Sequence, residues 1–526
     1  CPSGCAAGYS GESCTQVCPS GTYGIGCAST CSPNCAADGS GTSVCDAANG
    51  TCLLGCKDGY MSPMCTQVCP PGTYGKNCTL KCSQSCKTDT SGIPICDKAN
   101  GTCLNGTCDN GWFGTDCKYK CRCSGNVCPT ADGQCSSCMS GWFGPACQYV
   151  NLAQVSDLPS MEPLLTDNND TTCLPMNSTS TSVNITWSMP YTFTWMRITV
   201  QNPALLSNIA VRFNSTQVAC STLKNATVNS QTLDIHCHQI GLVTQVTLMG
   251  SGVSSLCSVY ISGGRDVALR QNTTQSSTYA TYGSDKAVDG NTDPQFSITN
   301  TCTATNLETN PSWSVRFSIP EAVNRYVLYN RDTNPERLVN FNFTSLNSAN
   351  AVVYNYMDAS TTPLSVYTIV TTTATVSTVT IQLSGTNKLL TICEFEIYGD
   401  SACAVGMYGR NCEKMCNCAN NNDPCFVSTG GCPSGCAPGY LGESCTQICN
   451  PGKYGAQCGL SCSQNCMGSG TACSNIDGTC LQGCKTGYKP PTCQELNAGN
   501  SYKSSFGAIV RAVVGAVATL VIAMKF

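Results

Sequence analysis

The residues best suited to hold a ligand by polar contacts lie in the segment YNRDTNPERL, residues 329–338. Arg331 and Arg337 carry permanently charged, planar guanidinium groups, whose N–H donors suit hydroxyl, ring and carboxylate oxygens. Asp332 and Glu336 lie beside them in the sequence, so the four side chains could instead pair with one another as structure. Both interpretations stay open here: an altered or acidic ligand, or ion pairs that serve the fold alone.

Nothing in the sequence indicates catalysis. There is no nucleophile elbow, no phosphate-binding glycine loop and no zinc-binding helix motif. The chain has two histidines, His236 and His238, which flank Cys237 in the sequence HCH. A cystine between two strand histidines is favoured over a metal site, because a disulfide sulfur is no thiolate ligand. We therefore expect a binding protein and not an enzyme.

The composition is that of a disulfide-built extracellular protein. Of 526 residues 47 are cysteine, a density that needs an oxidising compartment. Charged residues make up 11%, the net charge is −4 and no basic run exists, so nucleic acid is excluded as an expected partner. Sequons for N-glycosylation point to the same secretory route, at Asn49, Asn77, Asn100, Asn105, Asn169, Asn177, Asn184, Asn214, Asn225, Asn272 and Asn342.

The cysteines fall into two dense arms around a cysteine-poor middle. They number 25 in residues 1–147, six in 173–393 and 16 in 403–493. CPSGCAAGYSGESC at 1–14 returns as CPSGCAPGYLGESC at 432–445, so the arms are built of repeats. A module of this size buries too little apolar surface to fold without its cystines.

These repeats resemble EGF-like and laminin-type EGF modules, as found in multiple-EGF-domain proteins and class F scavenger receptors. The expected modules are 1–17 (partial), 18–68, 69–120, 121–150, 401–448 and 449–496. We expect them to act mainly as spacers. Cys1 lacks a partner in the first, partial module, and the chain opens without a signal peptide, so we expect a fragment or a processed product.

The middle of the chain predicts antiparallel β-sandwiches. Alternating β-branched and polar residues recur between Gly, Asn, Pro and Ser turns, in segments 196–202, 208–214, 245–250, 324–330 and 377–385. The expected fold class is all-β, with disulfide-rich EGF-like arrays flanking two galactose-binding-like jelly-roll sandwiches at 151–262 and 263–400. In the first sandwich, Cys173, Cys220, Cys237 and Cys257 can pair in three ways, of which we favour Cys220 with Cys237.

The second sandwich resembles the F-type lectins, or fucolectins, of the discoidin (F5/8 type C) family. Five ordered motifs carry the resemblance: DVALRQNTTQSSTY (266–279), KAVDGNTD (286–293), TCTATNLETNPSWSV (301–315), YNRDTNPERL (329–338) and ICEFEIYG (392–399). Residues 151–262 look like a divergent relative, since LTDNNDTTC echoes AVDGNTD. The resemblance implies that Cys302 pairs with Cys393.

The resemblance also implies a calcium ion in residues 263–400. Asp289 and Asn291 match loop ligands, Glu394 matches a strand ligand, Thr301 replaces a usual serine, and Lys286 can offer only its backbone carbonyl. Hard oxygen donors of this kind suit calcium. An ordinary Asx turn with a buried glutamate is the alternative.

The implied sugar site departs from the family pattern. Ala304 stands where fucose-binding members carry a histidine, Arg331 and Asp332 are in place, and Arg337 comes one residue early. Losing the imidazole removes a direct hydrogen bond, so ordinary fucose binding is not expected.

The C-terminal residues 497–526 form a polar spacer and an apolar run. This pattern suits a GPI-anchor signal, with a short spanning helix as the alternative. We therefore expect a cell-surface or secreted recognition or adhesion protein that binds glycans or glycoproteins. The alternatives are a scavenger or phagocytic receptor for lipids, modified proteins or apoptotic cells, and a structural matrix protein.

Overall fold

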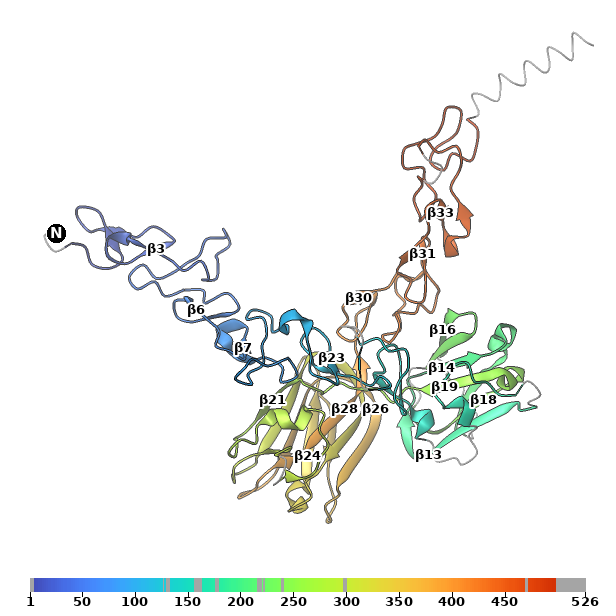
Figure 1. Cartoon of the computed structure of the whole chain (residues 1–526), viewed down its shortest axis with the longest axis horizontal. Helices are drawn as coiled ribbons and strands as arrows, with labels where there is room; N and C mark the ends of the chain where they lie inside the picture. Colours follow the sequence, from blue (N-terminus) through green and yellow to red (C-terminus); the bar gives the residue numbers. More distant parts are fainter. Residues whose placement is uncertain are drawn as a thin grey trace, which may run out of the picture. The chain divides into compact units, whose positions relative to one another are not determined.

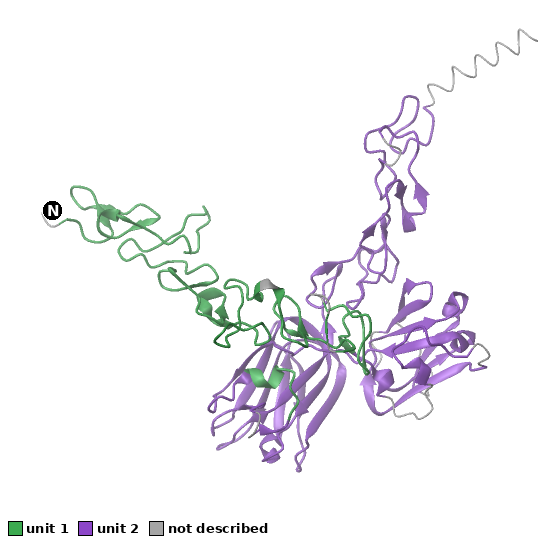
Figure 2. Cartoon of the chain, viewed as in Figure 1, with its two compact units in different colours: residues 1–149, 285–293 green, residues 150–284, 294–526 purple. Residues whose placement is uncertain are grey.

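The computed structural model describes residues 4–125, 127–128, 133–155, 163–175, 179–214, 220, 223–237, 241–296, 300–468 and 472–497. Its described elements are strands and short 3-10 helices, which confirms the all-β fold class (Figure 1). The chain divides into two compact units, one of residues 1–149 and 285–293 and one of residues 150–284 and 294–526 (Figure 2). Among the described residues, no helix is long and apolar enough to cross a membrane.

The first unit consists of consecutive small disulfide modules. Their strands are two residues long and pair as hairpins. The strands are β1 (Tyr9–Ser10), β2 (Gln16–Val17), β3 (Thr22–Tyr23), β4 (Ser29–Thr30), β5 (Tyr60–Met61), β6 (Gln67–Val68), β7 (Thr73–Tyr74), β8 (Leu80–Lys81), β9 (Trp112–Phe113), β10 (Tyr119–Lys120), β11 (Trp142–Phe143) and β12 (Tyr149–Val150), with η1 (Ile25–Cys27), η2 (Lys76–Cys78) and η3 (Leu104–Gly106) between them. Cystines replace an apolar core: one module is closed by Cys18–Cys27, Cys31–Cys45, Cys35–Cys52 and Cys56–Cys65.

A glycine beneath a tyrosine ring explains one recurring motif of the modules. Gly101 has φ +78°, and a Cβ there would lie 2.4 Å from the ring of Tyr74. Gly478 has φ +76°, and its Cβ would lie 2.5 Å from the ring of Tyr454. Any larger residue would meet both a left-handed backbone and a clash, so the repeats need glycine here.

The first sandwich packs a three-stranded sheet, order β13-β18-β15, and a four-stranded sheet, order β16-β17-β14-β19. Its elements are η4 (Leu152–Gln154), η5 (Pro163–Leu165), β13 (Ser182–Thr192), β14 (Trp195–Val200), η6 (Pro203–Asn208), β15 (Ala210–Phe213), β16 (Leu223–Asn229), β17 (Thr232–Cys237), β18 (Leu242–Met249), η7 (Ser251–Ser255) and β19 (Leu256–Ile261). Alternate residues such as Ile185, Ile198 and Val246 fill one core. The favoured disulfide Cys220–Cys237 is confirmed, and Cys173 pairs with Cys257.

The second sandwich is built on a larger sheet of order β20-β28-β23-β26-β24-β25, with β21 added to β23, and the short pair β22-β27. Its elements are β20 (Arg265–Asp266), β21 (Asn272–Gln275), η8 (Ser284–Val288), β22 (Thr303–Ala304), β23 (Ser312–Tyr329), η9 (Pro335–Leu338), β24 (Phe341–Leu346), β25 (Val352–Met357), β26 (Val366–Leu383), β27 (Thr391–Ile392) and β28 (Glu394–Ser401). Buried rings of Trp313, Tyr326, Phe343 and Phe395 contact one another in its core.

The chain ends in two further disulfide modules within the second unit. Their elements are β29 (Met407–Tyr408), β30 (Lys414–Met415), β31 (Tyr440–Leu441), β32 (Gln447–Ile448), β33 (Lys453–Tyr454), η10 (Ala456–Cys458) and β34 (Leu460–Ser461). The module of residues 403–445 contacts both sandwiches. Its Glu443 carboxylate accepts from Arg197 of the first sandwich at 2.8 Å, and the Arg410 carbonyl accepts from Arg265 of the second at 3.0 Å.

Candidate functional site

Arg331 follows directly on the end of β23, in a turn held by Asn330. The Asn330 amide donates to the carbonyls of Pro335 and Leu364 at 2.9 and 3.0 Å, and its Oδ1 accepts from the Arg331 N–H at 2.8 Å. These bonds fix the backbone from which the Arg331 side chain starts. The side chain is buried, with 4% of its residue surface exposed.

The Arg331 guanidinium lies flat on an aromatic ring and has donors to spare. Its Cζ is 3.6 Å from the centroid of the Phe296 ring. Nη2 donates to Thr333 Oγ1 at 3.1 Å, whereas Nε and Nη1 are buried without a hydrogen-bond partner in the described structure. Buried donors left without an acceptor are costly, so this arrangement is suited to a ligand that supplies oxygens.

The electrostatic surroundings of Arg331 also favour an incoming anion. Burial lowers the pKa of Arg331 and the nearby Arg337 lowers it further, whereas Asp332 and Glu336 act in the opposite direction. Within the described ranges, no ion pair joins either arginine to these carboxylates. The geometry therefore does not favour the interpretation in which the four side chains serve only the fold.

Ala304 lies in one cluster with Phe296, the ring beneath Arg331, and with Tyr282. It is 1% exposed in β22, its N–H donates to the Tyr282 carbonyl at 3.2 Å, and its own carbonyl accepts from the Tyr279 N–H at 3.0 Å. The Tyr282 ring stacks on Phe296 with centroids 4.4 Å apart, and Phe296 in turn underlies Arg331. The structure thus brings Ala304 and Arg331 together through two rings. Sequence reasoning missed both rings, because each belongs to a loop without a periodic pattern.

Asp332 and Arg337 flank this centre. Asp332 is exposed, and its N–H donates to the Pro294 carbonyl at 3.0 Å. Arg337 is half-buried in η9, where its N–H donates to the Asn334 carbonyl at 3.2 Å. The half-buried Arg337 can therefore offer a positive charge to a ligand, while the buried Arg331 offers directed hydrogen-bond donors.

The expected calcium ligands are divided between the two compact units. In the first unit, Asp289 Oδ1 accepts from the Asn291 N–H at 2.8 Å, and Asn291 Oδ1 accepts from the Asp293 N–H at 3.1 Å. In the second unit, Thr301 is 5% exposed and Glu394, at the start of β28, is fully buried. A fully buried carboxylate and an Asx-rich loop fit the donor chemistry of calcium, which binds several oxygens in flexible geometry.

A disulfide joins Cys302 to Cys393, next to Thr301 and Glu394. His236 is buried in β17 and stacks on Trp195, while His238 lies outside the described residues. In the part of the chain that the structure describes, the clusters with metal-ligand spacing are all cysteines. These cysteines are bound in disulfides, so no thiolate site is present among them.

Most sequon asparagines that the structure describes lie at the surface. Asn49, Asn77, Asn100, Asn169, Asn184, Asn225 and Asn272 are exposed, and Asn214 and Asn342 are half-buried. Asn177 and the side chain of Asn105 lie outside the described structure. The exposed positions could accept glycans without rearrangement.

Comparison with known proteins identifies parts of the chain. Residues 286–388 match the family model of the NedA-like, galactose-binding domain of F5/8 type C proteins. Human multiple epidermal growth factor-like domains protein 6 is 37% identical over 73 residues, which are 13% of this chain and 4% of that protein's length. The chain therefore combines an F5/8 type C-like, galactose-binding-like domain with EGF-like repeats.

Solved lectin structures are similar to part of the chain. The lectin domain of lectinolysin in complex with Lewis b antigen is 31% identical and covers 26% of this chain and 96% of its own, with a TM-score of 0.25. A fucolectin from striped bass (Morone saxatilis) serum is 21% identical and covers 45% of this chain and 89% of its own, with a TM-score of 0.23.

Proposed function

We propose that this chain is an extracellular glycan-recognition protein whose second sandwich binds the ligand at Arg331. The observation that carries the proposal is the buried guanidinium of Arg331, stacked on Phe296 with Nε and Nη1 unpartnered. A ligand carboxylate or pair of hydroxyls would satisfy these donors. The matched galactose-binding domain over residues 286–388 supports a carbohydrate as the ligand class.

The preferred glycan in this proposal carries an acidic group and is not an ordinary fucose. Ala304 supplies no imidazole to a sugar hydroxyl, and its side chain is buried against the aromatic group. Arg331 and Arg337 are close enough for each charge to disfavour the other, and a carboxylate between them would relieve that repulsion. The sequence also supports a calcium ion held by Asp289, Asn291, Thr301 and Glu394, whose role would be to fix the neighbouring loop.

A glycan array probed with the purified chain tests this proposal. Wild type should bind glycans that carry sialic or uronic acids, and Arg331→Ala should lose that binding. Arg316→Ala is the matched control, since Arg316 is an exposed arginine of β23, the strand that precedes Arg331. Ala304→His should gain binding to fucosylated glycans. Equal glycan binding by wild type and Arg331→Ala would overturn the proposal.

A further candidate function is that of a surface receptor for lipids or modified proteins, bound by the EGF-like repeats. The repeats expose an apolar side chain at equivalent positions, namely Val17, Val68 and Ile448. Binding to lipid vesicles that persists in Arg331→Ala and that free glycans do not compete would select this candidate.

We also propose that residues 497–526, most of which lie outside the described structure, anchor the chain to a cell surface. Release of the protein from intact cells by phosphatidylinositol-specific phospholipase C would support a GPI anchor. Retention after that treatment would support a spanning segment.

A further inference from the structure

A second candidate site is a cavity of about 570 Å³ inside the second unit, separate from Arg331. Its walls come from three domains: Trp195 and neighbours in the first sandwich, Asn324 and Thr373 in the second, and Phe426 in the module of residues 403–445. The lining is mainly apolar. Size and polarity both lie in the range of small-molecule sites, which often form at domain junctions.

Direct hydrogen bonds join the domains that form these walls. Arg197 Nη2 donates to Glu443 at 2.8 Å from the first sandwich to the module. Thr192 Oγ1 donates to the Thr371 carbonyl at 2.7 Å between the two sandwiches. These bonds link the first sandwich both to the module and to the second sandwich, and so connect the three domains around the cavity.

One side of the cavity is a stack of aromatic rings. The His236 ring lies parallel to the Phe426 ring, with centroids 3.4 Å apart, and to the Trp195 ring, with centroids 5.4 Å apart. Flat rings of this kind are suited to a flat apolar partner.

The second sandwich presents a polar group to the cavity at a backbone irregularity. The register of β23 with both of its neighbours, β26 and β28, shifts between Val323 and Arg325. Asn324 occupies this bulge, is 7% exposed and lines the cavity. Bulges often redirect a side chain toward a functional site, and an amide offers both a donor and an acceptor.

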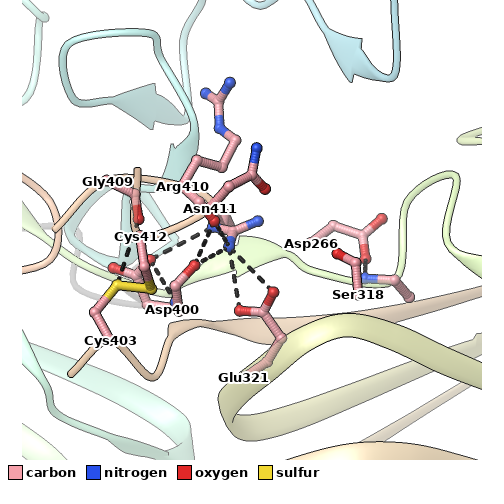
Figure 3. Close-up of polar contacts among 12 residues, drawn as sticks. Asp266, Ser318, Glu321, Asp400, Cys403, Gly409, Arg410, Asn411 and Cys412 are labelled. Carbon is pink, nitrogen blue, oxygen red and sulfur yellow. Dashed lines mark hydrogen bonds and ion pairs between the residues drawn. A yellow bond between two sulfur atoms is a disulfide. The ribbon is translucent and has the colours of Figure 1, made fainter. Parts of the chain in front are cut away.

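The charged groups of the lining are already neutralised. Lys224 Nζ lies 3.7 Å from Asp423, and Asp400 Oδ1 lies 3.4 Å from Arg265 Nε. Figure 3 shows Asp400 in a network with Glu321 and the backbone of Arg410, at the base of the module. Because Lys224 and Asp400 each already have an oppositely charged partner, the cavity is suited to an uncharged ligand.

We propose that this cavity binds a neutral, flat, mainly apolar small molecule. The rings of His236 and Phe426 line its apolar face, and Asn324 hydrogen-bonds a hydroxyl or carbonyl group of the ligand. Because the walls belong to three domains, binding also stabilises their junction.

The test is a titration of the whole chain with the neutral fluorophore N-phenyl-1-naphthylamine. Emission should rise to saturation at one site per chain, with energy transfer from tryptophan. Thr373→Trp places a large side chain in the cavity from an exposed position on β26 and should weaken binding by about tenfold or more. Thr368→Trp, exposed on the same strand but outside the cavity, should bind as wild type does.

Unchanged binding by Thr373→Trp, or a non-saturating signal in wild type, would overturn the proposal, because it would place the probe on exposed apolar residues. Ala404→Phe blocks the cavity from the module side and gives an independent result if Thr373→Trp unfolds. Arg331→Ala should bind the probe normally, which separates this site from the proposed glycan site.

Discussion

The two sandwiches connect a polar loop to their last strand with the same covalent bond but with different polar chemistry. In the first, Cys257 at the start of β19 pairs with Cys173. In the second, Cys393 just before β28 pairs with Cys302. The residue after the strand cysteine is Ser258 in one case and Glu394 in the other.

This difference of one residue changes which polar groups can connect the loop to the last strand of each sandwich. In the first sandwich, the loop supplies the acid: Asp170 accepts from Ser258 Oγ at 2.6 Å and from Tyr260 OH at 2.8 Å. In the second, the strand supplies the acid, Glu394, and the resemblance assigns further oxygen ligands to the loop. Hydroxyl donors can satisfy the Asp170 carboxylate directly, whereas the resemblance to F-type lectins implies that Glu394 is a calcium ligand.

Both sandwiches also hold an arginine between two carboxylates. Arg197 contacts Asp234 at 2.7 and 2.9 Å as well as Glu443. The second sandwich has longer contacts, from Arg265 to Glu321 at 3.1 Å and to Asp400 at 3.4 Å. Arg197 therefore forms a tight bidentate pair with Asp234, whereas the contacts of Arg265 are looser.

The largest effect is expected from Arg197→Ala. It leaves Asp234, which is 0% exposed, as a buried charge without its partner, which should cost about 3–5 kcal/mol of unfolding free energy. Urea unfolding followed by tryptophan fluorescence measures this loss. Glu443→Ala removes a half-exposed partner of the same arginine and should cost about 1 kcal/mol or less. Equal losses in the two variants would show that the buried pair with Asp234 stabilises the fold no more than the half-exposed pair with Glu443.

Removing calcium should affect the second sandwich and leave the first unchanged. At a free calcium concentration of 100 times its Kd, the bound ion adds about 2.7 kcal/mol to the stability of the domain that binds it. Chelation should therefore speed hydrogen exchange in β28 and leave β19 unchanged. Glu394→Gln should abolish the response, and Ser258→Ala is the matched control in the first sandwich. Equal exchange in β28 with calcium and with chelator would contradict the assigned cation.

Asp170→Ala should destabilise the first sandwich by about 2 kcal/mol, because it removes the carboxylate that accepts from the buried hydroxyls of Ser258 and Tyr260. Ser258→Ala removes one of these bonds and should cost about half as much. Differential scanning calorimetry measures both variants, and added calcium should rescue neither. A calcium-dependent rescue would show that the first loop also uses a cation.

The sequence predicted what local spacing encodes. Repeated cysteines and glycines located the disulfide modules, because a module is closed by cystines between residues less than 20 positions apart. Alternation located strands such as β18, since one of its faces is buried and the other is not. Arg331 was found because its segment belongs to a recognisable motif.

The missed features depend on residues that are distant in the chain. Phe296 lies beneath Arg331, Asp170 reaches Ser258 across 88 positions, and Arg197 reaches Glu443 across 246. No periodic pattern records such contacts, because they form only when loops and domains pack. The docking of the module of residues 403–445 was missed for the same reason, since its sequence matches modules of the other arm.

The smallest effect expected is a pH dependence of the looser arginine cluster. Burial raises the pKa of Glu321 to about 7, with Arg265 opposing this shift and Asp400 adding to it. The folded chain thus holds a proton that the unfolded chain has released above its ordinary pKa of 4.5, so stability should fall as pH rises from about 4.5 to 7 and level off above that.

Between pH 6 and 8 the fall should be about 1 kcal/mol, because the folded chain releases most of this proton in that window. Thermal unfolding of wild type and Glu321→Gln between pH 6 and 8 measures it, and the glutamine variant should show a smaller slope. Burial raises the pKa of Asp234 in the tighter cluster as well, although two short bonds from Arg197 oppose that shift. An unchanged slope in Glu321→Gln would therefore assign the pH dependence to another group.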